Sequence, residues 1–275
     1  LSEGMPKFAN ENIRSADSDG DLLVQACSND AQVCAHAIRN LNRIAMGTAK
    51  MRWSQTGYGR TSSTSVAQET PRNLFGFKDG TNNIKSEDGD AKLNEHLWVQ
   101  KGDDSGADWM AGGTYFVVRK IHMFAEMWDN LRLIEQEQTF GRDKRYGAPL
   151  NVTAPTSGKD EFKPIDFKAK NKEGELEVPA DSHIAIVNPE QNKGRWMLRR
   201  GYNYTEGSDA LGRLSAGLFF IAFVRDPRTN FYPILDKMTQ KDALSEYLQH
   251  QARALFAIPA GIGQSDTMVG QALFS

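Results

Sequence analysis

The sequence is poor in cysteine: its 275 residues contain two, Cys27 and Cys34. Two cysteines are too few for a disulfide framework and lack the spacing of a metal site, so we expect two small buried side chains. Long hydrophobic runs are also missing, because the longest, residues 218–224, has the length of a strand and not of a membrane span. The formal net charge is −2. A nucleic-acid partner is therefore not expected, since it needs a basic surface.

The composition that remains is that of an ordinary globular protein, with 39% hydrophobic and 25% charged residues. The length is sufficient for one large domain or two smaller ones. No secretory signal peptide is visible in the sequence as it stands. Position 1 is not an initiator methionine, and residues 1–6 look like the middle of a protein. We therefore expect the chain to be part of a longer protein.

The second half of the chain alternates between strand and helix patterns. Residues 213–225 are too continuously apolar to alternate, which predicts a strand buried on both faces. Asp226 can cap a helix that begins with Pro227. The predicted strands are residues 113–123, 183–187, 213–225 and 255–259, and the predicted helices are residues 124–138, 229–238 and 242–249.

The first half has weaker signals. Residues 21–28 and 51–58 predict strands, and residues 31–45 carry apolar side chains at helical spacing behind a cap at Asn29 or Asp30. Loops are expected at residues 61–70 and 87–94. Residues 153–179 are charged and poor in large apolar side chains, which predicts a long exposed insertion.

An internal repeat connects the two halves. Residues 22–30 align without a gap on residues 218–226, and each segment reads as a strand, an acidic cap and the start of a helix. A β-α-β-β-α-β unit ends in this strand–helix–strand arrangement. The pattern predicts an α+β fold of duplicated ferredoxin-like repeats, the first without its opening strands. We assign residues 1–110 to the latter part of the first repeat, with a glycine-rich loop, and residues 111–275 to the second.

That glycine-rich loop, within residues 73–83, reads Gly-Phe-Lys-Asp-Gly at its centre. Gly76 and Gly80 let the backbone turn tightly and lie close to a flat ligand. Phe75 and Phe77 supply apolar walls, so that Asp79 is a single carboxylate among aromatic side chains. Asp-Gly is also a common dipeptide of surface turns, and the loop alone does not distinguish these two interpretations.

Two further motifs follow in order: Asp-Ser-His at 181–183 with Asn-Pro at 188–189, and Leu-Arg-Arg-Gly-Tyr at 198–202. With Gly-x-x-Asp-Gly they resemble the dye-decolorising peroxidases, and within them the deferrochelatase/peroxidase type of bacterial iron-uptake systems. The resemblance covers essentially the whole chain, including residues 140–144 and 147–150. It implies the same duplicated fold, which is like a dimeric α+β barrel, and one haem b per chain.

The resemblance implies that His183, among the five histidines, is the axial ligand of the haem iron. A neutral imidazole is a suitable ligand for this metal. A ligand histidine normally donates its other N–H to an oxygen, and Asp242 is the candidate acceptor by resemblance. Without the resemblance, Asp242 is equally well interpreted as a helix N-cap.

Asp79 and Arg199 are the expected catalytic pair on the opposite face of the haem. Cleavage of peroxide needs a group that moves a proton between its oxygens and a fixed positive charge. Arginine does not lose its proton, so Asp79 is the proton carrier. Arg199 is preferred to Arg200 because the first arginine of the motif matches the family. From the sequence alone, the two arginines can also be a phosphate-binding or surface pair.

Further haem contacts are implied by the resemblance. Related enzymes can carry arginine at the position of Glu190, and a glutamate cannot pair with a haem propionate, so this contact is the weakest. Nearby aromatic side chains can relay electrons from bulky substrates, or simply pack. The expected haem contacts are Gly80, Thr81, Asn82, His183, Asn188, Pro189, Glu190 and Arg199, and the aromatic side chains are Trp196, Tyr202 and Tyr204.

Three functions follow as alternatives. The first is a peroxidase that reduces hydrogen peroxide and oxidises dyes, phenols or other bulky donors. The second is release of iron from haem with the porphyrin left intact, for which we identify no residue. The third is a non-catalytic haem carrier. The resemblance also implies an extracytoplasmic location, and it allows membrane partners of an iron-uptake system and a homo-oligomer.

Overall fold

One antiparallel sheet organises the chain in this computed structural model, which describes residues 4–274. Leu1 to Glu3, at the opening discussed above, and Ser275 lie outside the described residues. The strand order is β1-β4-β5-β2-β6, and β3 pairs with β5 beside this path. The strands are β1 (Tyr58–Arg60), β2 (Thr114–Met123), β3 (Leu198–Arg199), β4 (Tyr202–Ser208), β5 (Leu214–Val224) and β6 (Leu248–Ile258).

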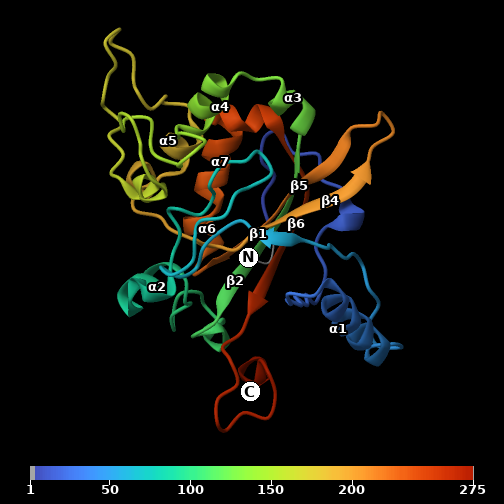
Figure 1. Cartoon of the computed structure of the whole chain (residues 1–275). Coiled ribbons are helices and arrows are strands. Elements are labelled where there is room, and N and C mark those ends of the chain that lie inside the picture. Colours follow the sequence, from blue (N-terminus) through green and yellow to red (C-terminus); the bar gives the residue numbers. More distant parts are fainter. Residues whose placement is uncertain (1–3, 275) are drawn as a thin grey trace.

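Helices connect the strands, and three of them form a group beside the sheet. In Figure 1, α4, α5 and α7 lie together, whereas α1 lies apart from them. The α-helices are α1 (Ala31–Ile44), α2 (Asp90–His96), α3 (Ala125–Asp129), α4 (Leu133–Phe140), α5 (His183–Val187), α6 (Pro227–Asn230) and α7 (Tyr232–Lys241). Short 3-10 helices include Gly158–Phe162, Pro189–Asn192 and Ala243–Tyr247.

The second half forms a β-α-β-β-α-β unit. Its order along the chain is β2, helices α3 to α5, the neighbouring strands β4 and β5, helices α6 and α7, and finally β6. β2 lies between β5 and β6 and is antiparallel to both. The predicted α+β class is confirmed, and this arrangement is the ferredoxin-like unit expected for the second repeat. The proposed boundary near residue 110 stays a prediction.

Both faces of the sheet are covered. Successive side chains of a strand point to opposite faces, so Val117 and Phe116 of β2 belong to different clusters. The Val117 cluster packs against Phe231 and Leu235, next to and within α7. The opposite cluster packs against partly buried side chains from the first half of the chain, including Trp53. The expectation that β5 is buried on both faces is confirmed, because it contributes to both clusters.

The N-terminal region agrees with the prediction only in its helix. α1 begins after Asp30, whose carboxylate accepts the N–H of Gln32, as expected for a cap. The predicted strands at residues 21–28 and 51–58 are wrong, because this region forms only the short β1 at its end. A strand needs a hydrogen-bonding neighbour, and residues 21–28 have none in the described chain.

α1 itself is uncovered. It has no buried residue, and its apolar side chains, such as Leu41 and Ile44, are exposed. Cys27 is exposed and Cys34 is half-buried, so the prediction of two buried cysteines is wrong. An apolar pattern in a segment therefore does not ensure that other parts of the protein bury its side chains.

Other predictions need correction. The helix expected at residues 242–249 is only the short 3-10 helix Ala243–Tyr247, after which β6 begins. The helix expected at residues 124–138 is divided into α3 and α4, and the loop expected at 87–94 contains the start of α2. Residues 183–187 form the helix α5, not a strand. Periodicity cannot distinguish a short buried strand from a short buried helix. Here the helical form places His183 in the first turn of α5.

The segment 153–179 is largely irregular, but it is not wholly exposed. Asp160 and Glu161 are buried in the 3-10 helix Gly158–Phe162. Among the described residues, no helix is long and apolar enough to cross a membrane.

Candidate active site

The loop that carries Asp79 is closed by a side chain. Asn73 Oδ1 accepts the backbone N–H of Phe75 at 3.0 Å and of Phe77 at 3.3 Å. The N–H of Asn73 in turn donates to the carbonyl of Phe77 at 3.0 Å. Asn73 opens the motif in the sequence, but its structural role was not anticipated. It makes the position of Asp79 depend on a defined turn.

The glycine after Asp79 is required by close packing. Gly80 has a φ of +94°, and a Cβ atom there would lie 2.6 Å from the Cα of Ser62. Such a contact is sterically excluded, so another residue would displace one of the two segments. The Asp79 loop is therefore pressed against the buried segment 61–63.

Arg199 is held in place through its backbone. It lies in β3, opposite Ala222 of β5. The buried Asn83 accepts the N–H of Arg199 at 2.8 Å and donates to its carbonyl at 2.9 Å. Nδ2 of Asn83 also donates to the carbonyl of Ser63 at 2.9 Å. The sequence suggested no role for Asn83, although it ends the stretch 73–83.

The side chains of Asp79 and Arg199 meet. Nη1 of Arg199 donates to Oδ1 of Asp79 at 2.9 Å, and Nη2 donates to the carbonyl of Asn82 at 3.3 Å. The two side chains remain 21% and 22% exposed. A carboxylate and a guanidinium are thus presented together at an accessible position. It is Arg199, and not Arg200, that pairs with Asp79.

His183 begins α5 and pairs with Asp242. Its Nδ1 lies 2.7 Å from Oδ2 of Asp242, whose side chain is fully buried. The other carboxylate oxygen, Oδ1, accepts the N–H of Leu244 at 2.9 Å and caps the 3-10 helix Ala243–Tyr247. Both interpretations of Asp242 therefore hold together. An ionised carboxylate only accepts hydrogen bonds, so a neutral imidazole in this contact has its proton on Nδ1 and its lone pair on Nε2.

Phe140 connects the two pairs. Its ring stacks on Phe77 of the Asp79 loop, with centroids 4.1 Å apart, and lies edge-on to His183 at 6.0 Å. The next residue, Gly141, has a φ of +78°, and a Cβ there would lie 2.7 Å from side-chain atoms of Ile184 and Ser182. The end of α4 therefore approaches α5 closely. The aromatic cluster ties the Asp79 loop to the histidine helix.

The Asn-Pro-Glu segment forms a cap. Asn188 accepts the N–H of Glu190 at 2.9 Å, with Pro189 as the first residue of the 3-10 helix Pro189–Asn192. Glu190 is exposed. Asn192, for which the sequence suggested no role, is buried and donates to the carbonyls of Ile186 at 2.7 Å and Asn188 at 2.8 Å. This segment fixes the chain directly after the histidine helix.

The remaining selected side chains have defined surroundings. Thr81 donates to Glu161 at 2.6 Å. Nζ of Lys92 lies 3.6 Å from the ring centroid of Trp196. The Tyr202 hydroxyl lies 3.6 Å from Sγ of Cys27. Tyr204 is buried, and burial raises its pKa. Tyr204 thus packs in the core of the sheet, whereas Trp196 and Tyr202 lie nearer the surface.

The other histidines occupy different environments. His250 is buried, accepts a hydrogen bond from Nε of Arg119 at 3.1 Å, and has its pKa lowered by burial to about 3. His96 lies 3.3 Å from Asn230, and His36 is exposed on α1. Of the histidines described here, His183 is the one paired with a buried carboxylate at hydrogen-bond distance.

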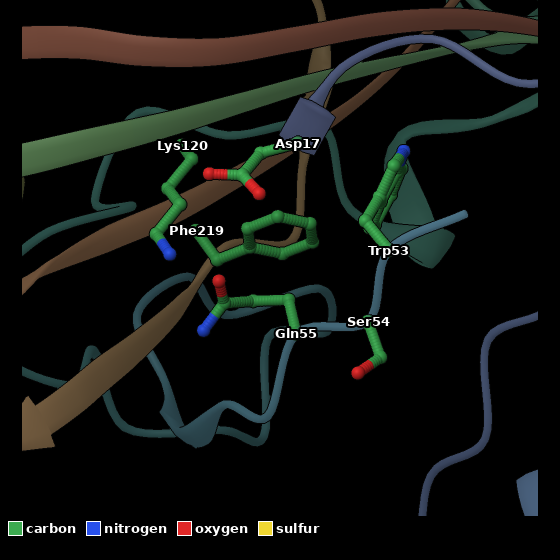
Figure 2. Close-up of a pocket in the computed structure, with 6 residues that line it drawn as sticks. All are labelled: Asp17, Trp53, Ser54, Gln55, Lys120 and Phe219. Carbon is green, nitrogen blue, oxygen red and sulfur yellow. The ribbon is translucent and has the colours of Figure 1, made fainter. Parts of the chain in front are cut away.

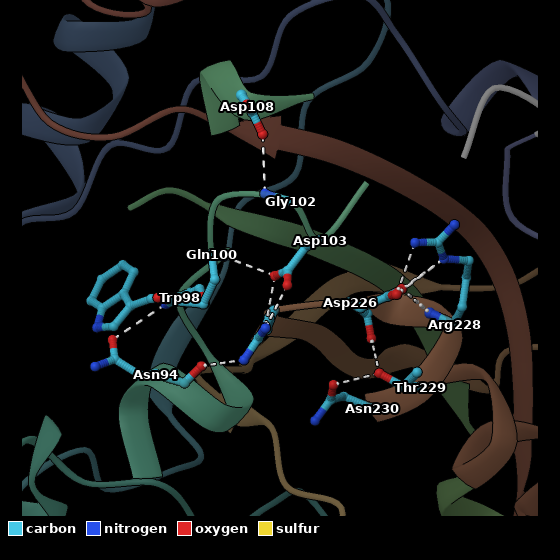
Figure 3. Close-up of polar contacts among 11 residues, drawn as sticks. Asn94, Trp98, Gln100, Gly102, Asp103, Asp108, Asp226, Arg228, Thr229 and Asn230 are labelled. Atoms are coloured by element: carbon cyan, nitrogen blue, oxygen red, sulfur yellow. Dashed lines mark hydrogen bonds and ion pairs between the residues drawn. The ribbon is translucent and has the colours of Figure 1, made fainter. Parts of the chain in front are cut away.

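Two other regions of the structure contain polar side chains. The pocket drawn in Figure 2, beside Trp53, Lys120 and Phe219, has a volume of about 20 Å³, which is enough for about one water molecule. Figure 3 shows the acidic side chains Asp103 and Asp226. Asp103 pairs with Arg225, and Asp226 pairs with Arg228. Arg228 also pairs with Asp104, and this contact joins the start of α6 to the loop after α2. Neither region places free acid–base groups around a cavity.

The residues present fit a haem. Within residues 4–274, no group of three or more His, Cys, Asp or Glu side chains is placed to hold a metal ion. Haem iron needs only one protein ligand. His183 is 20% exposed, with Nδ1 paired and Nε2 making no hydrogen bond to a described residue. Arg200 has a buried Nε without a hydrogen-bond partner in the described chain.

Comparison with known proteins adds the family context. The model of the Dyp-type peroxidase C-terminal region matches residues 70–263, and that of the N-terminal region matches residues 3–59. Ferric DtpA from Streptomyces lividans is similar in structure, with a TM-score of 0.88 and 38% identity over 98% of this chain and 70% of that chain. A DyP-type peroxidase from Streptomyces coelicolor gives the same values.

Curated relatives are similar over most of this chain. The dye-decolorizing peroxidase of Thermobifida fusca is 34% identical over 258 residues, or 93% of this chain and 58% of that protein. The deferrochelatase of Escherichia coli strain K12 is 34% identical over 272 residues, or 98% of this chain and 62% of that protein. The chain thus spans about three fifths of the length of these relatives.

Proposed function

The chain belongs to the Dyp-type peroxidase family, and from this premise we propose that it is a haem peroxidase that reduces hydrogen peroxide. Its reducing substrates are dyes, phenols or other bulky donors, each of which gives up one electron at a time. The observation that supports the proposal best is the formation of two acid–base pairs, Asp79–Arg199 and His183–Asp242, joined through Phe140. The family relationship alone does not identify which residues act.

His183 and Asp242 hold the cofactor. Nε2 of His183 would bind the iron of haem b, one haem per chain, while Nδ1–H donates to Asp242. This hydrogen bond fixes the orientation of the ring and makes the imidazole a stronger donor. Since Asp242 also accepts from Leu244, the carboxylate cannot rotate without breaking the cap of the following helix.

Asp79 and Arg199 act on peroxide. Haem, when bound, supplies the iron and the electrons for reduction of the O–O bond. Asp79 accepts a proton from one peroxide oxygen and delivers it to the departing oxygen, which leaves as water. Arg199 keeps its positive charge and stabilises the negative charge on the departing oxygen. In this arrangement Gly80, Thr81 and Asn82 would contact the haem.

The test is the absorption spectrum of the haem-loaded full chain, followed by peroxide-dependent bleaching of a dye. We expect the spectrum of a histidine-bound haem and bleaching that requires both haem and peroxide. A haem carrier would give the spectrum without the bleaching. Absence of both would reject the peroxidase and carrier assignments together.

Release of iron from haem is the second candidate, because relatives named deferrochelatase are similar over 98% of the chain. Among the described side chains, we identify none that would perform this reaction. Incubation with haem without oxygen, followed by porphyrin fluorescence, tests it. Appearance of metal-free porphyrin would support the activity, and a stable haem spectrum would reject it.

We also propose an extracytoplasmic location and a role in iron uptake, with iron-uptake membrane proteins as partners. These proposals rest on the resemblance to iron-uptake peroxidases that are exported with their haem. Cell fractionation with detection of the protein tests the location. The mass of the haem-loaded protein in solution tests whether it forms a homo-oligomer.

A further inference from the structure

We infer that Glu161 is a positioning residue for Asp79, because its carboxylate accepts hydrogen bonds from residues on both sides of the aspartate. We refer to these two hydrogen bonds as the grip. The inference rests on the proposed peroxidase function. Glu161 comes from the segment 153–179, for which the sequence predicted only an exposed insertion. It is 3% exposed and does not contact Asp79 itself.

The grip consists of two short contacts. Oε1 of Glu161 accepts from Nζ of Lys78 at 2.7 Å, and Oε2 accepts from the hydroxyl of Thr81 at 2.6 Å. Lys78 directly precedes Asp79, and Thr81 follows it by two residues. Each carboxylate oxygen thus binds one end of the tetrapeptide that contains the proton carrier. Since charged partners give stronger hydrogen bonds, the tetrapeptide is held more firmly than a loop tip in solvent.

Glu161 is itself anchored from behind. The buried Arg142 donates through Nη1 to the carbonyl of Glu161 at 2.9 Å and to the carbonyl of Gly147 at 2.6 Å. Asp160 accepts the N–H groups of Thr156 at 2.7 Å and of Ser157 at 3.0 Å, which closes the start of the 3-10 helix. The segment that carries Glu161 is therefore itself held by hydrogen bonds to buried groups.

The charges around the site make this carboxylate hard to replace. Lys78 is mostly buried, with 15% of its side chain exposed, and Glu161 is its ion-pair partner. Burial lowers the pKa of Arg142 to about 10, and the charge of Glu161 acts in the opposite direction. A buried ion pair is weak evidence for stability, and its better attested use is to fix a particular arrangement. Here that arrangement is the loop of Asp79.

The functional consequence follows from the geometry of proton transfer. A general base must lie within hydrogen-bond reach of the proton that it removes. A displacement of about 1 Å can cost on the order of 100-fold in rate. Release of the grip should therefore slow the reaction with peroxide while the haem ligand His183, which Glu161 does not contact, remains in place.

The test compares Glu161→Ala with Glu173→Ala in the haem-loaded full chain. Glu173 belongs to the same segment but is exposed. We expect Glu161→Ala to keep its haem spectrum and to lower the rate constant for peroxide, by stopped-flow absorbance, by about 10-fold to 100-fold. Hydrogen exchange of residues 76–82 should also become faster. The control should change neither measurement.

Thr81→Val is the second variant, because it removes one contact and leaves the ion pair of Lys78 intact. We expect a several-fold loss of rate.

In an Asp79→Asn background, Glu161→Ala should add almost no further loss, since the two residues act as one unit. An equal loss in both backgrounds, or an unchanged rate in Glu161→Ala, would overturn the inference. A wild-type protein that does not react with peroxide would instead reject the proposed function, and unchanged hydrogen exchange in Glu161→Ala would still reject the grip.

Discussion

The two acid–base pairs of the site differ in how they are enclosed. In the pair Asp79–Arg199 both side chains are about one fifth exposed, at 21% and 22%. In the pair His183–Asp242 the carboxylate is completely buried and only the histidine is exposed, at 20%. The contact distances are similar, 2.9 Å and 2.7 Å. The difference in burial leaves the pair Asp79–Arg199 accessible to a small reactant, whereas the carboxylate of Asp242 is enclosed by the protein.

The supports of the two carboxylates differ in the same sense. Asp242 is bound to its own helix, because it accepts from Leu244 as well as from His183. Asp79 lies in a loop whose shape depends on other side chains, Asn73 within the loop and Glu161 outside it. A buried carboxylate that accepts two hydrogen bonds is suited to hold the proposed ligand, His183, in one orientation. A partly exposed carboxylate in a supported loop suits a group that changes its protonation in each cycle.

The largest expected effect is at the fixed pair. His183→Ala removes the side chain proposed to bind the iron, so we expect loss of the histidine-bound haem spectrum and of most retained haem. The measurement is the ratio of haem to protein after purification. His36→Ala, on the exposed α1, is the matched control and should retain its haem. Full haem content and activity in His183→Ala would show that another group binds the iron.

Arg199→Leu is expected to have the next largest effect. It removes the fixed positive charge, and loss of one such stabilising group costs on the order of 10²–10³ in rate. The rate constant for peroxide, from stopped-flow absorbance, should fall at every pH because arginine stays charged throughout. Arg200→Leu is the control, since Arg200 is adjacent in the chain and makes no contact with Asp79. Equal losses in the two variants would remove the distinction between the arginines.

Asp79→Asn should have a somewhat smaller effect on the same rate constant, of about 100-fold. In the wild type the carboxylate must be ionised to accept a proton, so the reaction should slow as the pH falls. An amide cannot take the proton, and the variant should therefore lose this acidic limb of the profile. Arg199→Leu should keep it. A limb that persists in Asp79→Asn would assign the proton transfer to another group.

Asp242→Asn should have the smallest effect of the four substitutions. The side-chain amide of asparagine has one oxygen, which can accept from His183 or from Leu244. Its NH₂ group then faces the other of these two donors. Either His183 changes its tautomer or the helix loses its cap, and we expect about 10-fold weaker haem binding. Haem titration measures it, with Asp236→Asn on the exposed side of α7 as the control. Unchanged haem affinity would mean that the buried carboxylate does not govern the histidine.

Local signals in the sequence predicted several elements correctly. The helical spacing of residues 31–45 and the cap at Asp30 depend only on neighbouring residues, and α1 forms with that cap. The same holds for Asp226, which caps α6 at Pro227. The continuous apolar run of β5 also indicated its burial on both faces. The residues selected for the site, Asp79 with Arg199 and His183 with Asp242, are pairs in the structure.

Other features could not be predicted because they depend on distant partners. Residues 183–187 were too short for their periodicity to distinguish a strand from a helix. Asn73, Asn83 and Asn192 contribute through hydrogen bonds to backbone groups, and isolated asparagines have no distinctive pattern. The burial of Glu161 was also missed, because a charged segment is normally exposed.

By itself, the sequence determined which segments can form helices or strands, where helices begin, and which chemical groups are available, because these depend on residues a few positions apart. Only the tertiary structure decided which segments are covered. α7 buries Ile234 and Leu235, and Leu235 packs against the sheet, whereas α1, also amphipathic, buries no residue. Only the tertiary structure brought Asp79 to Arg199, which is 120 positions away. Burial and pairing depend on how helices and strands pack against one another, and this packing exists only after the sheet and its helices have assembled.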